Sequence, residues 1–186
     1  MVRLNKIYTR TGDTGSAGLV DGSRVSKSSL RMTAIGEVDE ANAAIGVALS
    51  YLGDGELRSH LLRIQNDMFD LGADVATPGE VEGALRILAS QVERLEQEID
   101  AMNADLAPLT SFILPSGSPA VSALHLARAV TRRAERAAVA LHEADPLNPQ
   151  LLAYLNRLSD HLFVAARKVA SEEGGDVLWQ PGATRT

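Results

Sequence analysis

The residue types best suited to chemistry lie near the N-terminus, where residues 9–18 read Thr-Arg-Thr-Gly-Asp-Thr-Gly-Ser-Ala-Gly. Three glycines in seven positions allow positive φ angles and let backbone N–H groups come close to a ligand. Hydroxyl groups and one guanidinium group add further donors, on Thr9, Arg10, Thr11, Thr14 and Ser16. Such donors, if directed at one point, would bind a polyphosphate. The alternative interpretation of this segment is a mobile polar N-terminus.

Asp13 is the acidic residue of this glycine-rich loop, which we define as residues 9–18. Its ionised carboxylate accepts hydrogen bonds but donates none, so it would repel a phosphate unless a cation such as Mg²⁺ lay between them. The sequence leaves two roles open for Asp13: it could organise Mg²⁺ or the loop itself.

A second cationic cluster lies on a predicted helix. Arg128, Arg132, Glu135 and Arg136 are spaced i, i+4, i+7 and i+8, so they project from one side. We call the three arginines of this set the arginine arc. With Arg133 nearby, they exceed what one glutamate can neutralise, and guanidinium groups packed near apolar residues favour an anion as partner. The alternative is a solvated face with weak Arg–Glu pairs.

Apolar residues recur at steps of three and four and predict five helices, at about residues 35–52, 57–75, 85–102, 119–141 and 149–173. No stretch alternates as a strand does, so the predicted fold class is all-α, a five-helix bundle behind a glycine-rich loop. The fourth helix is expected to bury, opposite the arc, Leu126, Val130, Ala134, Ala137 and Leu141.

We expect one domain over residues 1–186, divided into an N-terminal segment (1–32), the bundle (33–174) and a tail (175–186) that is loose apart from Trp179. A linker over residues 105–117 separates the third and fourth helices.

Composition narrows the function classes. The net charge of −6 disfavours a broad nucleic-acid surface. The positive charge is nevertheless clustered, since six of the 18 Lys and Arg residues lie in residues 1–31, including Arg3 and Lys6. This clustering points to a small anionic ligand. Cysteine is absent, which excludes disulfides, a thiolate zinc site and a cysteine nucleophile. No apolar run is long enough to span a membrane and no secretory leader is evident, so the expected location is the cytoplasm.

Common catalytic patterns are also missing. There is no G-x-x-x-x-G-K-[ST] phosphate-binding motif and no Glu-x-x-His pair of the kind found in di-iron bundles. The histidines are scattered and are each predicted to be structural or exposed, not metal ligands; they are His60, His125, His142 and His161.

Seven strings, in order along residues 5–170, resemble one family, the PduO-type ATP:cob(I)alamin adenosyltransferases. They are Lys6-Ile7-Tyr8-Thr9-Arg10-Thr11-Gly12-Asp13, Arg24-Val25-Ser26-Lys27, Val38-Asp39-Glu40-Ala41-Asn42, Ile64-Gln65 with Leu71-Gly72-Ala73-Asp74-Val75-Ala76-Thr77-Pro78, Phe112-Ile113-Leu114-Pro115, Arg132-Arg133-Ala134-Glu135-Arg136, and Tyr154-Leu155-Asn156-Arg157-Leu158-Ser159-Asp160.

The resemblance implies a homotrimer with active sites between neighbouring subunits. It also implies a reaction in which the Co(I) centre of cob(I)alamin attacks the 5′ carbon of ATP, triphosphate leaves and adenosylcobalamin forms. Mg²⁺ is the implied cofactor, held through the ATP phosphates. A reductase that supplies Co(I) and a cobalamin-dependent enzyme that accepts the product are implied as partners.

The family's roles carry over by position. The ATP-binding residues would be Thr9, Arg10, Thr11, Gly12, Asp13, Thr14, Gly15, Ser16, Ala17, Lys27, Arg132, Arg133, Glu135, Arg136 and Asn156. Arg132 would be catalytic, stabilising charge on the leaving triphosphate. Asp39 and Arg128 would pair across the subunit interface, or form a salt bridge within one chain. The family commonly has a threonine where Ala17 stands, so no hydroxyl contact carries over there.

Phe112 would be the second catalytic residue and the cobalamin-binding one, keeping the lower face of the corrin free of its nitrogen ligand; alone, it would be an anchor for its loop. The chain lacks Asp-x-His-x-x-G, the pattern of enzymes that use cobalamin as cofactor. Two further classes stay open from the residues: a non-catalytic nucleotide or cobalamin carrier, and a helical interaction module.

Overall fold

The computed structural model describes residues 7–185; Arg3 and Lys6 of the N-terminal basic cluster, and Thr186, lie outside that range. Five helices form the described chain, as the periodicity predicts: α1 (Leu30–Leu49), α2 (Glu56–Val75), α3 (Ala89–Asn103), α4 (Pro119–Ala144) and α5 (Pro149–Glu172). No helix of this range is both long and apolar enough to cross a bilayer.

The all-α prediction needs one correction, because a small sheet precedes the bundle. Strand β1 (Ser16–Gly18) pairs antiparallel with β2 (Arg24–Ser26), with Ala17 opposite Val25 in the register. Three residues on each side are too few for an alternating pattern to be visible in the sequence. The β1–β2 hairpin therefore carries the last three residues of the glycine-rich loop.

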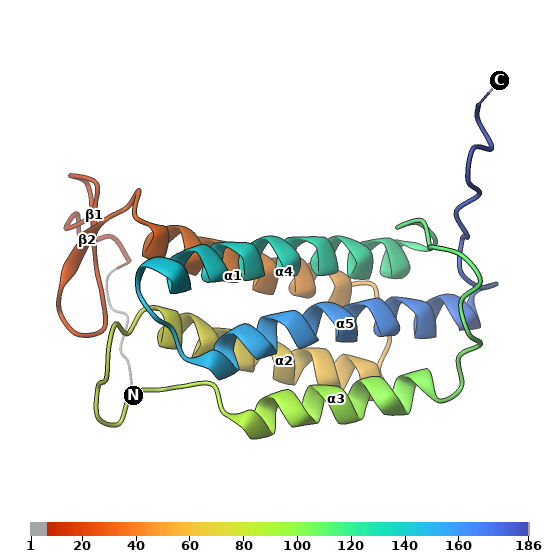
Figure 1. Ribbon diagram of the computed structural model, residues 1–186, viewed down its shortest axis with the longest axis horizontal. Helices are drawn as coiled ribbons and strands as arrows, with labels where there is room; N and C mark the ends of the chain where they lie inside the picture. The colour runs from red at the N-terminus through yellow and green to blue at the C-terminus, as the bar shows by residue number, and fades with distance from the viewer. Residues whose placement is uncertain (1–6, 186) are drawn as a thin grey trace.

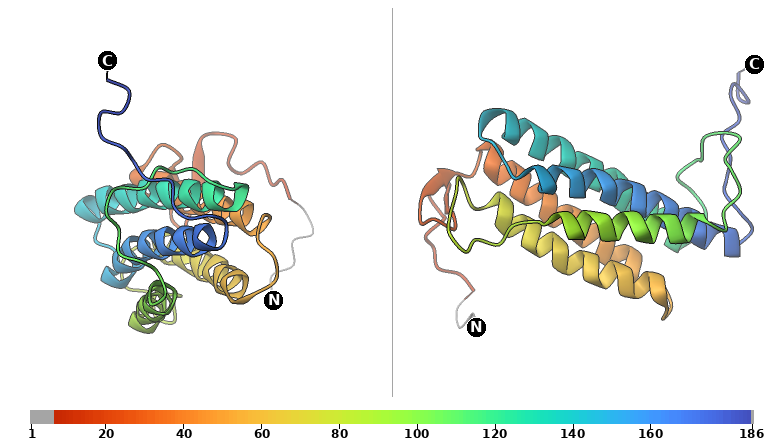
Figure 2. Two further views of the ribbon diagram at one scale, coloured as in Figure 1. Left: turned by 90° about the vertical axis from the view of Figure 1, so that its right-hand side faces the viewer. Right: turned by 60° about the horizontal axis from the view of Figure 1, so that its bottom comes forward.

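The helices lie roughly alongside one another, with α1 packed against α2 and α4, and α5 packed against α4 and α3 (Figures 1 and 2). The hairpin sits at the end of the bundle where α1 begins, and the linker before α4 and the C-terminal tail lie at the opposite end. The core between the helices includes Ile45, Ile64, Leu71, Leu124 and Leu158, all fully buried.

Side-chain caps set three of the helix starts. Ser29, Ser118 and Asn148 each accept a hydrogen bond from a backbone N–H of the first turn, and proline follows the latter two caps. Because Ser29 caps α1, this helix begins at Leu30, five residues before the first apolar residue of the predicted seam.

Asp74, with no exposed surface, joins the connection after α2 to the start of α5. Its carboxylate accepts hydrogen bonds from Arg86 Nη1 (2.7 Å), the Ile87 amide (2.8 Å) and Asn148 Nδ2 (2.8 Å). These contacts hold residues 86–87 in a non-helical path, so α3 begins at Ala89 and not near Leu85 as predicted. Leu85 is exposed rather than part of a buried seam.

Polar pairs connect α2 to α3 and α5. Asp67 on α2 accepts from Gln91 (2.9 Å), from Tyr154 Oη (2.9 Å) and from Arg94. Burial raises the pKa of Tyr154, and the negative charge of Asp67 raises it further, so the hydroxyl stays protonated and donates.

Glu98 on α3 forms a similar link. It pairs with Arg63 and lies 2.9 Å from His161 Nε2. Burial alone would raise the pKa of Glu98, but the His161 hydrogen bond and nearby positive charges outweigh it, and the pKa falls. Burial lowers the pKa of His161, although the hydrogen bond with Glu98 and the charge of that carboxylate oppose this shift.

The tail is more ordered than the sequence suggests. Trp179 N donates to the Phe112 carbonyl (2.7 Å), and Leu114 N donates to the Val177 carbonyl (2.8 Å), so residues 177–179 lie beside the linker. Arg167 on α5 forms an ion pair with Asp176 of the tail, with 3.0 Å between Nε and Oδ2. These backbone pairings involve only a few residues on each side, and no local sequence pattern marks them.

We predict that Asp74→Asn lowers the free energy of unfolding by about 3 kcal/mol, because it leaves the Arg86 charge and two buried donors short of an acceptor. Urea unfolding followed by circular dichroism measures the change. Asp54→Asn is the matched control, since Asp54 is fully exposed and its ion pair with Arg58, at 3.7 Å, contributes little to stability. Equal midpoints for both variants would contradict the role given to Asp74.

Candidate functional site

The glycine-rich loop is a compact turn that leads into β1. Asp13 N donates to the Arg10 carbonyl (3.4 Å) and Gly15 N to the Gly12 carbonyl (3.2 Å). Gly15 has φ 82°, a conformation that favours glycine, and Arg10 adopts φ 61° although it has a side chain. Backbone strain of this kind at a non-glycine residue is a feature of ligand-binding segments.

Lys27 lies directly over the loop. Its backbone N–H donates to the Gly15 carbonyl (2.9 Å). A Cβ added at Gly12 would come within 3.0 Å of Lys27 Nζ and 3.4 Å of the Ser16 carbonyl. Glycine at position 12 therefore lets the ammonium group approach the loop backbone, and the structure brings together these two predicted site residues.

Arg24 fastens the loop to the hairpin, a function that the residue types alone did not reveal. Its Nη2 donates to the Thr11 carbonyl (2.7 Å) and to Ser16 Oγ (2.8 Å), so one guanidinium group bridges both sides of the turn. The only sequence signal was its place in the string Arg24-Val25-Ser26-Lys27.

The Asp13 carboxylate is not used by the loop. Within residues 7–185 it accepts no hydrogen bond and forms no ion pair, and only its backbone N–H is engaged. Of the two roles open for Asp13, organising the loop has no contact to support it.

The arginine arc lies on the outer side of α4. Arg132 and Arg136 are exposed and line a hollow of about 300 Å³ together with Glu135, Val139 and Asn156. Asn156, from α5, donates to Glu135 (2.8 Å), and Arg136 donates to the Arg132 carbonyl (3.1 Å). Throughout the described range, no carboxylate lies within ion-pair distance of any arginine of the arc.

Arg133 differs from the arc. It pairs with Glu37 and Glu40 on α1, and the hydrogen bonds to these two carboxylates raise its pKa. Arg133 is therefore directed toward α1 in the single chain, and its role in ATP binding stays a prediction. Leu126, which was expected to be buried, is 57% exposed, whereas Leu124 is buried.

Arg128 is the partly buried member of the arc. Its Nε atom is buried without a hydrogen-bond partner, and burial together with the nearby Arg132 charge lowers its pKa. Asp39, the predicted partner, is exposed and lines a largely apolar hollow of about 440 Å³ on α1 and α2. No Arg128–Asp39 ion pair forms within the described chain, so the salt bridge within one chain is not seen.

His125, one turn before Arg128, is also buried, and neither of its ring nitrogens has a hydrogen-bond partner among residues 7–185. Burial lowers the pKa of His125, and the Arg128 charge lowers it further. The inner part of the arc thus holds unpaired polar atoms in a poorly solvated setting.

Phe112 belongs to the linker between α3 and α4, and this linker lies at the opposite end of the bundle from the hairpin (Figure 1). Its side chain is 77% exposed, and its ring lies 6.1 Å from that of Trp179. The Trp179 amide binds the Phe112 carbonyl, and Ser111 Oγ donates to the Trp179 carbonyl (2.7 Å). Since an anchor residue would bury its ring, the exposure argues against the loop-anchor interpretation.

The predicted site residues thus form three groups within one chain. Helix α4 has 26 residues and is about 39 Å long, with Arg132 near its middle. The hairpin, the arc and Phe112 are spread along that length, and no hydrogen bond or ion pair within residues 7–185 joins one group to another.

Comparison with known proteins gives a consistent result. The sequence profile of the family described as cobalamin adenosyltransferase matches residues 7–169. A corrinoid adenosyltransferase of Mycobacterium tuberculosis is 52% identical over all of this chain and 98% of its own length. One from Bacillus subtilis is 45% identical, covering 96% of this chain and 94% of its own.

Solved structures agree. A PduO-type ATP:corrinoid adenosyltransferase from Lactobacillus reuteri, with alanine replacing a phenylalanine, was solved with cobalamin and ATP. It superposes with a TM-score of 0.87 at 37% identity, over 94% of this chain and 99% of that one. A variant with lysine replacing an arginine, complexed with ATP, superposes with a TM-score of 0.87 at 36% identity, over 94% and 100%.

Proposed function

The chain belongs to the cobalamin adenosyltransferase family and is an ATP-dependent corrinoid adenosyltransferase. We propose that its glycine-rich loop and arginine arc hold the triphosphate of ATP while the 5′-deoxyadenosyl group passes to the cobalt of cob(I)alamin. An electron pair on Co(I) forms the new Co–C5′ bond. The bond from C5′ to the triphosphate oxygen breaks, and its electron pair leaves with the triphosphate. Triphosphate and adenosylcobalamin are the products.

The observation that carries this proposal is the unbalanced charge of the arc. Three guanidinium groups project from one side of α4, and no carboxylate of the described chain pairs with them. A leaving triphosphate is a multiply charged anion whose negative charge rises as the C5′–O bond breaks. Guanidinium groups already in place stabilise that charge without reorganising. We assign this role to Arg132, with Arg136 beside it.

The loop contributes the second part of the cradle. The backbone amides of Gly12 and Thr14, which donate no hydrogen bond within residues 7–185, and the Lys27 ammonium group are available to phosphate oxygens, and Arg24 keeps the turn in shape. The free Asp13 carboxylate fits Mg²⁺, which prefers carboxylate and phosphate oxygens. We propose that Asp13, directly or through water, holds the Mg²⁺ that neutralises the phosphates.

Glu135 and Asn156 form the remaining wall of the hollow beside Arg132. Their mutual hydrogen bond of 2.8 Å fixes a carboxylate oxygen and an amide next to the arginines. An amide and a carboxylate together offer a donor and an acceptor, which suits the adenine or ribose end of ATP. We therefore place the adenosine beside Asn156.

The separation of the three groups suggests that each site is completed by a neighbouring subunit. An ATP molecule is too short to reach from the hairpin to Phe112 along one bundle, since α4 alone is about 39 Å long. Arg128 has a buried unpaired Nε, and Asp39 is exposed beside an apolar hollow, so each lacks the partner that the other could supply. We propose a homotrimer in which this ion pair crosses the interface.

Phe112 then supplies the corrin side of the site. Its exposed ring, supported by Trp179, is placed to occupy the lower face of the corrin and exclude the nitrogen ligand. A cobalt without that donor holds less electron density and is easier to reduce to Co(I). A reductase would supply the electron, and a cobalamin-dependent enzyme would receive the product.

Arg132→Ala is expected to lower kcat by about 100-fold or more while the bundle stays folded, because the lost guanidinium group acts on the leaving charge. The assay follows the corrin absorbance with ATP, Mg²⁺ and chemically reduced cobalamin under anaerobic conditions. Arg132→Lys should retain ATP binding with an intermediate rate. Full activity in Arg132→Ala would remove this residue from the mechanism. No product from the unmodified protein would support the carrier alternative.

Phe112→Ala should slow the reaction that starts from Co(II) by roughly tenfold or more, and slow the reaction that starts from Co(I) much less. The reason is that the variant readmits a lower ligand, which makes reduction harder but leaves the nucleophile unchanged once formed. Leu109→Ala, in the same linker, is the control. An equal loss from both starting states would contradict the lower-ligand role.

A further inference from the structure

A second cluster of potential ligands lies within the bundle and shares no residue with the hairpin, the arginine arc or the linker that carries Phe112. His60 on α2, Glu98 on α3 and His161 on α5 each offer one ligand atom, and these atoms all lie within 4.8 Å of one another. We propose that this cluster, hereafter the HEH cluster, is a binding site for a divalent transition-metal ion of the Zn²⁺ type.

The distances suit a metal ion. Two ligand atoms on a tetrahedral zinc ion, each about 2.1 Å from it, lie about 3.4 Å apart. His60 Nδ1 lies 3.5 Å from Glu98 Oε2, which matches that separation, and His161 Nε2 lies 2.9 Å from the same oxygen. The widest pair would have to close by about 1.4 Å at most, which side-chain rotation can supply. The ion would replace the His161–Glu98 hydrogen bond.

The chemistry of the donor set favours zinc over magnesium. Two imidazoles and one carboxylate form a ligand set known from zinc sites that keep one position open, whereas Mg²⁺ prefers oxygen ligands only. His60 Nδ1 has no hydrogen-bond partner in the described chain although it is buried, so a ligand there would satisfy it. His161 is fully buried and Glu98 almost so, which would shield the ion from bulk solvent on the side of these two ligands.

Outer contacts already orient two of the three ligands. Arg63 holds the other oxygen of Glu98, leaving Oε2 to face the imidazoles. His60 Nε2 lies 3.6 Å from Glu56 Oε1, so its Nε2–H can be directed at a carboxylate while Nδ1 faces the ion. Carboxylates behind ligating imidazoles are the usual support of such sites.

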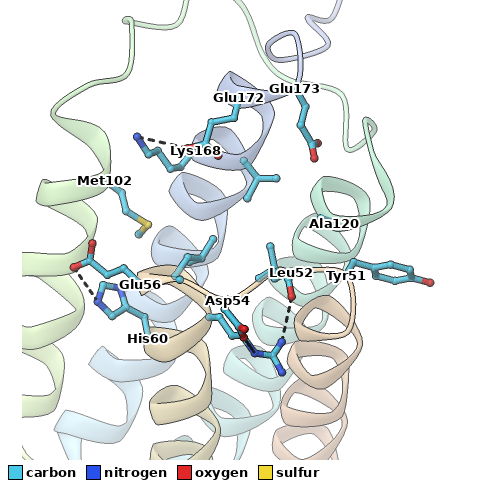
Figure 3. A pocket seen from close by; sticks show the side chains of 15 residues that line it. Tyr51, Leu52, Asp54, Glu56, His60, Met102, Ala120, Lys168, Glu172 and Glu173 are labelled. Atoms are coloured by element: carbon cyan, nitrogen blue, oxygen red, sulfur yellow. Dashed lines mark hydrogen bonds and ion pairs between the residues drawn. The ribbon is translucent and has the colours of Figure 1, made fainter.

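The HEH cluster also has a route of entry. Glu56 and His60 line a hollow of about 460 Å³ at the end of the bundle away from the hairpin, together with Met102 and Lys168 (Figure 3). Figure 3 shows His60 on the wall of this hollow with its imidazole linked to Glu56. An ion can enter there, and a water molecule could take the open fourth position.

The consequence would be a cross-link of three helices. Positions 60, 98 and 161 are far apart in the sequence, and no ligand spacing marks them, which is why the histidines were predicted to be structural or exposed. Helices α2 and α3 are connected mainly by polar pairs through Asp67 and Glu98, so an ion on Glu98 would add to that connection.

The test uses the full chain, stripped of metal with a chelator and free of nucleotide. Calorimetric titration with Zn²⁺ should give one ion per chain and raise the melting temperature. Co²⁺ should give the visible absorption of a tetrahedral nitrogen–oxygen site, and an excess of Mg²⁺ should not compete. No binding, or displacement by Mg²⁺, would overturn the proposal.

Variants assign the site. His60→Gln, on the most accessible ligand, should weaken Zn²⁺ binding by roughly 100-fold or more and abolish the Co²⁺ spectrum while circular dichroism shows a folded bundle. His161→Gln should do the same. Glu96→Gln, on the exposed side of α3, should bind as the unmodified protein does. Unchanged affinity in His60→Gln would show surface binding only and would contradict the HEH cluster as the site.

Discussion

The surplus of positive charge on α4 is the constraint around which the site is organised. Arg128, Arg132 and Arg136 lie on one side of a helix whose other sides are largely buried, so the arginines cannot turn away from one another. Arg133 shows what happens when carboxylates are within reach, because it pairs with Glu37 and Glu40 on α1. The arc has no such partners and therefore needs an anion or a neighbouring subunit.

The bundle gives this charge a fixed position. Asp74 joins the end of α2 to the start of α5, and Arg31, on the first turn of α1, pairs with Asp145 just after α4 and donates to the Val75 carbonyl. These buried polar contacts gather at the end of the bundle that carries the hairpin. A hydrogen bond of 3.2 Å from the Val20 amide to the Ala76 carbonyl attaches the hairpin there. The hairpin is thus attached to the end of α2, in the same bundle whose helix α4 carries the arc.

Sequence patterns predicted what depends on local periodicity and capping. The five helices followed from apolar spacing, and the predicted starts at residues 119 and 149 match those of α4 and α5. The start of α3 was wrong because tertiary contacts of Asp74 with Arg86 and Ile87 outweigh the local apolar pattern. The hairpin is too short to show alternation, and the pairing of Trp179 with Phe112 has no local signature.

The site shows the same division. The arc could be predicted because its three positions on one helix share a side whatever the tertiary fold. Arg24 and the orientation of Arg133 could not, since both depend on which backbone or helix lies opposite. The HEH cluster is the extreme case, because its three residues come from three helices and meet only after the bundle has formed.

The central claim is that the loop of one subunit and the arc of another hold the same ATP. Subunit complementation tests it most directly: Lys27→Glu and Arg132→Ala chains, each inactive alone, are unfolded, mixed in equal amounts and refolded together. If each site takes its loop and its arc from different subunits, about a quarter of the sites are intact and activity recovers to about that fraction. No recovery, although mass spectrometry shows mixed assemblies, would contradict the claim.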